Sequence, residues 1–193
     1  MTRSSFTTLF VPLMVIISVQ RLIVSFRQRA TLKGSVRHPW SFPVLMVLFT
    51  GILVGTIVEY FLVARPLNVW VAGGGLVVFA GSVVVRSVAI RTLGRYWSLH
   101  VEIRPEHQLV TSGIYGVVRH PIYLSVILES LSIPLIGNAY CTLLGTVGLY
   151  WPVLLWRLWM EEQAMVEKFG DQYVAYQRQV PALVPFAHCR TKP

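Results

Sequence analysis

Charge is scarce in this sequence, and so is cysteine. Only 13% of the 193 residues are charged, whereas 54% are hydrophobic, and the mean hydropathy is +0.61. Soluble domains carry about 25% charged residues, so the composition excludes a disordered chain and argues against an ordinary soluble domain. The two cysteines, Cys141 and Cys189, provide neither a disulfide framework nor a metal-binding cluster. The sequence also lacks a G-x-G-x-x-G after a strand, a phosphate-binding loop, an H-E-x-x-H zinc motif and any internal repeat.

The hydrophobic residues gather in five segments of roughly bilayer-spanning length, over residues 6–26, 41–64, 70–91, 122–139 and 140–160. The first has no cleavage site before the basic stretch that follows it, so we do not interpret it as a removable signal peptide. Pro134 lies in the fourth segment, and only Gly137-Asn138 separates it from the fifth, which predicts a tight helical hairpin. We therefore predict an all-α integral membrane protein of one domain, residues 1–193. It has about five transmembrane helices, and the last two form the hairpin.

Basic residues predict the orientation of these helices. The connections after the first, third and fifth segments carry lysines and arginines, whereas only Arg65 lies between the second and third and none between the fourth and fifth. Positively charged connections stay in the cytoplasm, so we expect the N-terminus outside and a cytoplasmic C-terminal tail. Trp40, Trp70 and Trp97 fall near segment ends, as interfacial anchors do. The net charge of +9 then reflects loops that face anionic lipid, and no nucleic-acid partner is expected.

Three ionisable residues, Arg86, Glu129 and Arg157, fall inside the hydrophobic segments, where a charge is costly unless it faces a cavity or a partner. We expect Glu129 to pair with one of these arginines. The alternative for Arg86 is that its side chain extends to the membrane surface. Glu59, near the outer end of the second segment, is expected to face water. The small residues expected to let helices approach closely are Gly51, Gly55, Gly73, Gly74, Gly75 and Gly81.

Polar residues concentrate in two stretches on the predicted cytoplasmic side, and the first covers residues 100–123. Arg119 and His120 precede Pro121, which suits the first turn of a helix whose free N–H groups favour an anionic ligand. The alternative is that Arg119 only sets the topology and that His120 only caps the helix.

The second polar stretch covers residues 157–176. Arg157 and Glu161 lie four residues apart and can pair on one helix face. A solvated helix face is the alternative explanation for the neighbouring acids Glu161 and Glu162. Gly170 is expected to end this helix, and Asp171 to cap a short helix that follows.

Both stretches contain multi-residue motifs. The first reads His107-x-Leu109-Val110-Thr111-Ser112-Gly113-x-Tyr115 and then Arg119-His120-Pro121-x-Tyr123. The second contains Trp156-Arg157, Glu161-Glu162, Phe169-Gly170, Tyr173, Tyr176, Val180-Pro181 and Pro185-Phe186. In this order around a helical hairpin, the motifs resemble the isoprenylcysteine carboxyl methyltransferase family, including its short prokaryotic members. Related membrane phospholipid and sterol-pathway enzymes share R-H-P-x-Y with a downstream Glu-Glu, so the motifs identify the cofactor better than the substrate.

The resemblance implies methyl transfer from S-adenosylmethionine, with S-adenosylhomocysteine as product. The cytoplasmic site would lie in a catalytic half, residues 92–193, that follows three N-terminal transmembrane helices in residues 6–91. Glu161 would accept the ribose hydroxyls, with Glu162 as the less certain neighbour, and Arg119 and Arg157 would lie near the methyl acceptor. By position in the motifs, the adenosine end would be lined by His107, Leu109, Val110 and Tyr115, and the amino-acid portion by His120, Pro121 and Tyr123.

The acceptor implied by the resemblance is a lipophilic molecule from the bilayer, such as the carboxylate of a prenylated cysteine, and no metal is expected. A carboxylate is already ionised at neutral pH and needs no general base. A phenol, enol or amine would need one, for which His100 and His120 are candidates. The alternatives are a phospholipid N-methyltransferase, an O-methyltransferase of an alkyl-chain small molecule and a non-catalytic small transporter.

Overall fold

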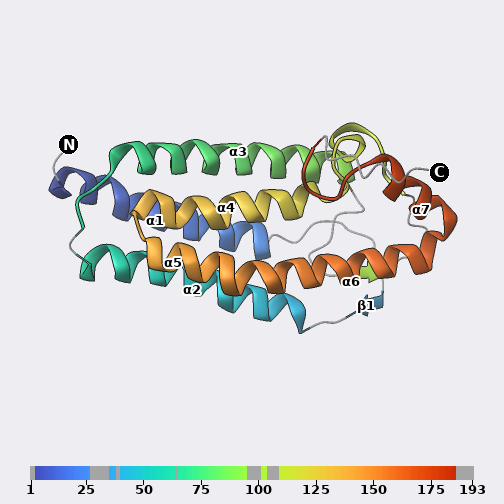
Figure 1. Ribbon diagram of the computed structural model, residues 1–193, viewed down its shortest axis with the longest axis horizontal. Helices are drawn as coiled ribbons and strands as arrows, with labels where there is room; N and C mark the ends of the chain where they lie inside the picture. Colours follow the sequence, from blue (N-terminus) through green and yellow to red (C-terminus); the bar gives the residue numbers. More distant parts are fainter. Residues whose placement is uncertain are drawn as a thin grey trace.

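The computed structural model describes residues 3–26, 35–37, 40–63, 65–94, 101–103 and 109–185. The long helices run along one common axis, and successive helices reverse direction (Figure 1). In chain order the helices are α1 (Arg3–Phe26), α2 (Ser41–Leu62), α3 (Val69–Leu93), α4 (Pro121–Gly137), α5 (Tyr140–Gly145), α6 (Trp151–Phe169) and α7 (Asp171–Gln179). A 3-10 turn, η2 (Gly113–Gly116), precedes α4, and a π-helical turn, η3 (Thr146–Tyr150), joins α5 to α6.

Four helical stretches are long and hydrophobic enough to cross a bilayer, namely Arg3–Ile23, Ser41–Leu62, Val69–Leu93 and the continuous helix Tyr140–Phe169. The fifth apolar helix, α4, has 17 residues. At 1.5 Å per residue it spans about 25 Å, less than a hydrocarbon core of roughly 30 Å. The prediction of an all-α, multi-pass integral membrane protein is confirmed, with four helices of bilayer-spanning length and α4 as a shorter apolar fifth.

The sequence did not predict a short antiparallel pairing between β1 (Ser35–Arg37) and β2 (Val101–Ile103), in which Val36 lies opposite Glu102. Strands of three residues are too short to show a hydrophobic alternation. β1 belongs to the connection between α1 and α2, and β2 to the connection between α3 and α4, where it also contacts α6. The pairing therefore joins two connections at the same end of the bundle.

The predicted hairpin between α4 and α5 is confirmed and turns at Asn138, which adopts a left-handed conformation (φ 53°, ψ 33°). Glu59 of α2 caps the start of α5, because its carboxylate accepts the backbone N–H groups of Cys141 at 3.0 Å and Thr142 at 2.8 Å. It also accepts the Thr142 hydroxyl at 2.9 Å and Arg65 Nη1 at 2.9 Å. The expectation that Glu59 faces water was wrong, since it is only 9% exposed. Free N–H groups at a helix start attract a carboxylate.

Close helix contacts occur at two of the glycines named above. A Cβ on Gly75 would lie 2.9 Å from the backbone nitrogen of Ile136, so α3 and α4 meet there backbone to backbone. A Cβ on Gly55 would lie 3.2 Å from the Thr142 hydroxyl oxygen. Within the described residues, nothing lies within 4 Å of a Cβ built on Gly51, Gly73, Gly74 or Gly81.

The π turn η3 has a cause in the sequence. Pro152 has no N–H, and its ring crowds the carbonyl four residues earlier, at Gly148. The helix widens immediately before Pro152, which relieves this crowding. The wide turn ends at Tyr150, which is 2% exposed and packs against Phe49 of α2 with ring centroids 6.0 Å apart.

The charges inside the bundle are paired. Glu129 is fully buried, and both of its carboxylate oxygens accept from Arg86. Arg86 is therefore a buried partner of Glu129 and does not extend to the membrane surface. Arg21 of α1, which the sequence did not single out, reaches the same carboxylate at 3.0 Å. Arg157, the other expected partner of Glu129, contacts α2 and α4 at a different place.

Candidate functional site

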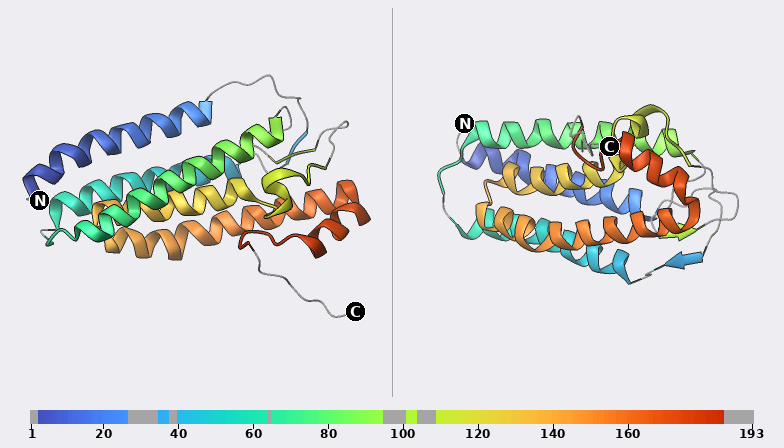
Figure 2. Two further views of the ribbon diagram at one scale, coloured as in Figure 1. Left: turned by 90° about the horizontal axis from the view of Figure 1, so that it is seen from above. Right: turned by 45° about the vertical axis from the view of Figure 1, so that its right-hand side comes forward.

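At one end of the bundle the start of α4 meets the second half of α6 and the helix α7, on the right in Figure 1 and again in both views of Figure 2. Gly170 makes this arrangement possible, because its φ of +54° ends α6 and lets α7 set off in a new direction. The predicted helix end at Gly170 is confirmed. Asp171 is the first residue of α7 and not its cap, since Gly170 occupies the capping position.

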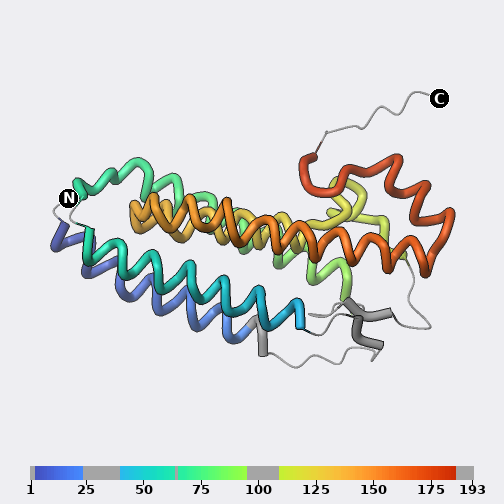
Figure 3. The backbone as a smooth tube through the Cα atoms, turned by 60° about the horizontal axis from the view of Figure 1, so that its bottom comes forward, coloured from blue at the N-terminus to red at the C-terminus, as the bar shows by residue number. Residues whose placement is uncertain are grey.

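The segment after α7 returns to the start of α4, as the red end of the tube beside the yellow-green segment in Figure 3 shows. The backbone N–H groups of Arg119 and His120 donate to the carbonyls of Pro181 at 2.9 Å and Ala182 at 3.0 Å. Arg119 Nη1 also donates to the Gln177 carbonyl at 3.0 Å. Segments far apart in the sequence therefore form one layer over the head of α4.

Glu162 of α6 is the centre of the first polar group. Its Oε1 accepts from Arg119 Nε at 3.0 Å and Nη2 at 2.6 Å, and lies 3.0 Å from His120 Nε2. Because an ionised carboxylate can only accept, the His120 contact needs a proton on Nε2. The Gln177 amide donates to Oε2 at 3.4 Å. Both oxygens of Glu162 are thus engaged, and the residue ties α6 to α4 and α7.

Glu161 belongs to a second polar group. The Tyr123 hydroxyl donates to Glu161 Oε2 at 2.7 Å and lies 3.3 Å from Arg157 Nε. Arg157 Nη1 donates to the Ser41 hydroxyl at 3.2 Å, so the start of α2 joins this group. Arg157 is 6% exposed and Tyr123 is 9% exposed. Among the described residues none hydrogen-bonds to Glu161 Oε1, which leaves that oxygen available to a ligand.

Three buried tyrosines line the same end of the bundle. Burial raises the pKa of Tyr173, and the charges of Glu162 and Glu161 raise it further. Burial and then the charge of Glu161 raise the pKa of Tyr115, and burial raises the pKa of Tyr176 to about 12. All three phenols stay protonated at neutral pH, so they act as donors and not as bases. Tyr176 donates to the Tyr115 carbonyl at 2.5 Å.

Most of the residues singled out in the sequence come together here. Leu109 and Val110 are partly buried in the segment that leads to η2, whereas His107 and His100 lie outside the described residues. Sequence reasoning missed Ser41 and Gln177. Gln177 lies one turn after Tyr173 on α7, so helical spacing could have predicted it. Ser41 could not be predicted in this way, because only the packing of α2 on α6 brings it to Arg157. The predicted residues that gather at the head of α4 are Tyr115, Arg119, His120, Pro121, Tyr123, Arg157, Glu161 and Glu162.

The side chains suit a ligand that carries a diol, a positive charge and a carboxylate. The free oxygen of Glu161 can accept hydroxyl groups, and two neighbouring carboxylates favour a cation. The first turn of α4 begins at Pro121, and His120 in the capping position makes no side-chain capping hydrogen bond. The free N–H groups of that turn therefore remain available to an anionic group. Among the described residues no group of three or more potential metal ligands is present.

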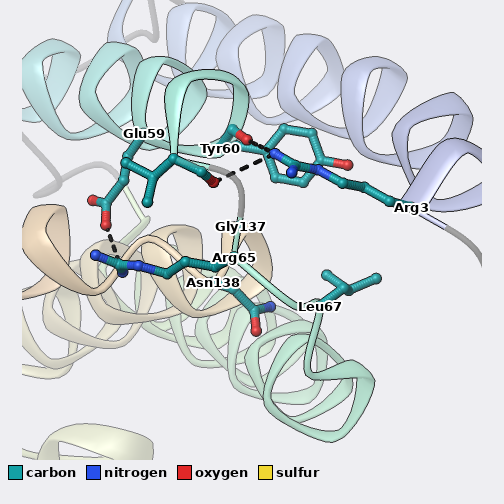
Figure 4. Close-up of a pocket in the computed structure, with 8 residues that line it drawn as sticks. Arg3, Glu59, Tyr60, Arg65, Leu67, Gly137 and Asn138 are labelled. Atoms are coloured by element: carbon teal, nitrogen blue, oxygen red, sulfur yellow. Dashed lines mark hydrogen bonds and ion pairs between the residues drawn. The ribbon is translucent and has the colours of Figure 1, made fainter.

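A separate pocket lies at the opposite end of the bundle (Figure 4). Its polar side chains already have partners, since Arg65 pairs with Glu59 and Arg3 donates to the carbonyls of Tyr60 and Val63. None of the residues predicted to form the site lines this pocket. Its polar groups hold the ends of α1, α2 and α5 together.

The fold is that of a multi-pass membrane protein. Its polar site lies at one end of the bundle, on the helical hairpin and on α7, which follows it. The model of the isoprenylcysteine carboxyl methyltransferase (ICMT) family matches residues 74–167, which include α4 and run through the two glutamates of α6. The chain belongs to the isoprenylcysteine carboxyl methyltransferase family. The resemblance seen in the motifs is thereby confirmed.

Individual relatives support this assignment. Protein-S-isoprenylcysteine O-methyltransferase B of Arabidopsis thaliana is 31% identical over 121 residues, which are 62% of this chain and 61% of that protein. The protein-S-isoprenylcysteine O-methyltransferase of Schizosaccharomyces pombe is 38% identical over 104 residues, 52% of this chain and 44% of that one. The uncharacterized protein YpbQ of Bacillus subtilis is 31% identical over 117 residues, 60% of this chain and 69% of that one.

A solved structure has a similar fold. The eukaryotic intramembrane Ras methyltransferase ICMT matches with a TM-score of 0.65 and 29% identity, over 78% of this chain and 54% of that one. The present chain thus spans 61% or less of the two named methyltransferases and 54% of the solved structure.

Proposed function

We propose that this protein is a membrane-embedded methyltransferase that uses S-adenosylmethionine to methylate a carboxylate on a lipophilic acceptor, such as a prenylated cysteine. The observation that carries the proposal is the hydrogen-bonded row of Glu161, Tyr123 and Arg157 in a chain of this family. The row places a carboxylate oxygen that no described residue hydrogen-bonds near a buried guanidinium. The carboxylate oxygen suits the diol of a cofactor, and the guanidinium suits an anionic acceptor.

The cofactor would be held at the head of α4, within the predicted catalytic half of the chain, residues 92–193. When bound, S-adenosylmethionine supplies an activated methyl group on a sulfonium. Glu161 accepts the ribose hydroxyls through its free oxygen, whereas Glu162, with both oxygens engaged, holds its neighbours in place. The amino-acid portion would lie against His120, Pro121 and Tyr123 at the first turn of α4. The adenosine end would be lined by His107, Leu109, Val110 and Tyr115.

The acceptor carboxylate would be held by Arg157. Tyr123 and Ser41 fix this guanidinium inside the bundle, and a fixed guanidinium can orient a carboxylate through paired hydrogen bonds. The carboxylate is ionised at neutral pH, so the reaction needs no general base. The layer formed by α7 and the segment after it keeps water from the head of α4. Arg119, expected near the acceptor, already contacts Glu162 and the Gln177 carbonyl, so we assign it a positioning role.

The same geometry argues against an amine acceptor, because a lipid ammonium group would meet the positive charge of Arg157. The test uses the full chain purified in detergent. We expect S-adenosylhomocysteine to bind in calorimetry, and isotope-labelled S-adenosylmethionine to methylate an S-prenyl cysteine carboxylate but not phosphatidylethanolamine. Methylation of phosphatidylethanolamine alone would reassign the enzyme to phospholipid N-methylation. Absence of S-adenosylhomocysteine binding would refute a methyltransferase altogether.

We further propose that this end of the bundle faces the cytoplasm, because the cofactor is a cytosolic solute. Ser112 and Ser4 are exposed near opposite ends of the bundle and suit single-cysteine labelling in a variant that lacks Cys141 and Cys189. In intact cells an impermeant thiol reagent should label Ser4→Cys, and it should reach Ser112→Cys only after permeabilisation. The reverse pattern would separate the motifs from the cytosolic cofactor and overturn the orientation.

A further inference from the structure

A third group of polar side chains, buried or nearly so, lies deeper in the bundle than Arg157. It consists of Arg21 on α1, Arg86 on α3, Glu129 on α4 and Tyr150 at the end of η3, and is called here the Glu129 cluster. Arg21 Nη1 lies 3.0 Å from Glu129 Oε2, and Arg86 donates to both oxygens of the same carboxylate. The exposed fractions of the Arg21, Arg86 and Glu129 side chains are 13%, 5% and 0%.

The charges of the Glu129 cluster do not balance. Two guanidinium groups face one carboxylate, and within the described residues no second carboxylate pairs with Arg21 or Arg86. Arginine stays protonated in proteins, so the excess positive charge cannot be removed by loss of a proton. A net charge inside the bilayer is costly unless something offsets it. An anionic ligand would remove that cost.

Two donors in the cluster are unused. Arg21 Nε and the Tyr150 hydroxyl are both buried, and neither has a hydrogen-bond partner in the part of the chain that the structure describes. They share one neighbour, because the Arg21 guanidinium lies 4.2 Å from the ring centroid of Phe49, and the Phe49 and Tyr150 rings are 6.0 Å apart. Tyr150 and Arg157 lie seven residues apart on the continuous helix Tyr140–Phe169, about 10 Å at 1.5 Å per residue. The cluster therefore lies about two helical turns from the proposed acceptor residue Arg157.

We propose that the Glu129 cluster binds the carboxylate of the lipophilic acceptor as it arrives from the bilayer, before that carboxylate reaches Arg157. This inference rests on the proposed function. The N–H of Arg21 and the O–H of Tyr150 donate to the carboxylate oxygens, and the net positive charge rejects amines.

The depth of the cluster selects the ligand. Glu129 lies eight residues beyond Pro121, about 12 Å along the α4 axis at 1.5 Å per residue. The phosphate of a membrane lipid stays in the headgroup region, whereas a carboxylate can reach this level where its charge is paired, as Arg21 and Arg86 would pair it.

Tyr150→Phe is the sharpest test, because it keeps the ring that packs against Phe49 and removes only a hydroxyl that has no hydrogen-bond partner among the described residues. A merely structural cluster would leave every acceptor parameter unchanged in this variant. We expect the KM for an S-prenyl cysteine carboxylate to rise about tenfold, as for loss of one hydrogen bond to a charged group. The turnover number, the affinity for S-adenosylhomocysteine and the melting temperature should stay near the wild-type values.

Arg21→Gln is the second variant, and Arg91→Gln is its control, since Arg91 is an exposed arginine five residues beyond Arg86 on α3. Direct binding is measured with the S-prenyl cysteine carboxylate, its neutral primary amide and palmitate. Arg21→Gln should weaken binding of the carboxylate about tenfold and leave binding of the amide unchanged, and Arg91→Gln should affect neither.

Four outcomes are distinguishable. Selective loss of carboxylate affinity in Tyr150→Phe and Arg21→Gln supports the site. An unchanged KM in both variants overturns it and leaves the cluster a structural ion pair, while the methyltransferase itself stands. Palmitate that binds as tightly as the prenyl cysteine, with the acceptor KM unmoved in the variants, identifies a site for bilayer fatty acids and overturns the acceptor assignment. A wild-type chain that binds no S-adenosylhomocysteine refutes the proposed function instead.

Discussion

Glu59 and Glu161 lie near opposite ends of the bundle, and the two ends use a carboxylate in different ways. Glu59 is saturated by protein donors, because two backbone N–H groups, the Thr142 hydroxyl and Arg65 all reach it. Within the described residues Glu161 accepts one hydrogen bond, from Tyr123, which leaves its other oxygen free. Both lie on helices of an apolar bundle, so the difference is in their partners. A saturated carboxylate holds the fold together, and an unsaturated one beside buried cations is ready for a ligand.

Glu162 stands between these two cases. It lies at the site end, next to Glu161, but its oxygens are engaged by Arg119, His120 and Gln177. It therefore resembles Glu59 in saturation and Glu161 in position. Substitutions at the three glutamates should separate stability from cofactor binding.

The largest effect is expected for Glu162→Ala. This change leaves Arg119, which is 9% exposed, without its carboxylate. Removal of one partner of a buried ion pair destabilises a protein by about 3 kcal/mol. The measurement is unfolding of the purified protein in detergent, with Gln163→Ala at the exposed neighbouring position as control.

A second substitution sharpens this prediction. Arg119→Met in the Glu162→Ala background should recover part of the lost stability, because it removes the unpaired guanidinium. Equal stability of wild type and Glu162→Ala would contradict the view that Glu162 joins α6 to α4 and α7.

Glu161→Gln should act on the cofactor instead. The loss of charged hydrogen bonds to the ribose, about 1.5–3 kcal/mol, should weaken S-adenosylhomocysteine binding at least tenfold in calorimetry. Stability should change little, because the Gln amide oxygen can still accept from Tyr123. An unchanged affinity would move the ribose contact to Glu162 and remove the contrast between the two neighbours.

Arg157→Lys is expected to act on turnover. Lysine keeps the charge but loses the planar fork that matches a carboxylate. Turnover should fall about tenfold, equivalent to roughly 1.4 kcal/mol of transition-state stabilisation, while the affinity for S-adenosylhomocysteine stays near wild type. If the cofactor affinity instead falls as much as the activity, Arg157 belongs to the cofactor site and not to the acceptor.

Glu59→Gln should give the smallest effect and the opposite pattern from Glu161→Gln. The amide keeps one acceptor oxygen for the start of α5 but loses the charge that pairs with Arg65. Loss of capping strength costs about 1 kcal/mol of stability, read as a lower melting temperature, with cofactor affinity unchanged. Weaker binding of S-adenosylhomocysteine in this variant would show that the two ends of the bundle are coupled.

Local features of the sequence predicted much of this structure. The hydrophobic runs predicted the transmembrane helices, the Gly137-Asn138 turn predicted the hairpin, and Gly170 predicted the end of α6. These features act over a few residues, through bilayer length, backbone conformation and turn chemistry. The motifs around His120 and Glu161 likewise identified the end of the bundle that holds the candidate site.

The partners of the long polar side chains were decided only by the tertiary structure. From the sequence we expected Glu59 to face water and assigned no role to Arg21. The sequence also did not predict which of Glu161 and Glu162 keeps an oxygen available to a ligand. Each answer depends on how neighbouring helices rotate and how closely they pack, as where α3 meets the α4 backbone at Gly75. A long side chain in an apolar bundle takes whichever charged partner that packing brings within reach, because an unpaired charge there is costly. Composition and periodicity determine that such partners are needed, and only the packing of distant segments determines which residues they are.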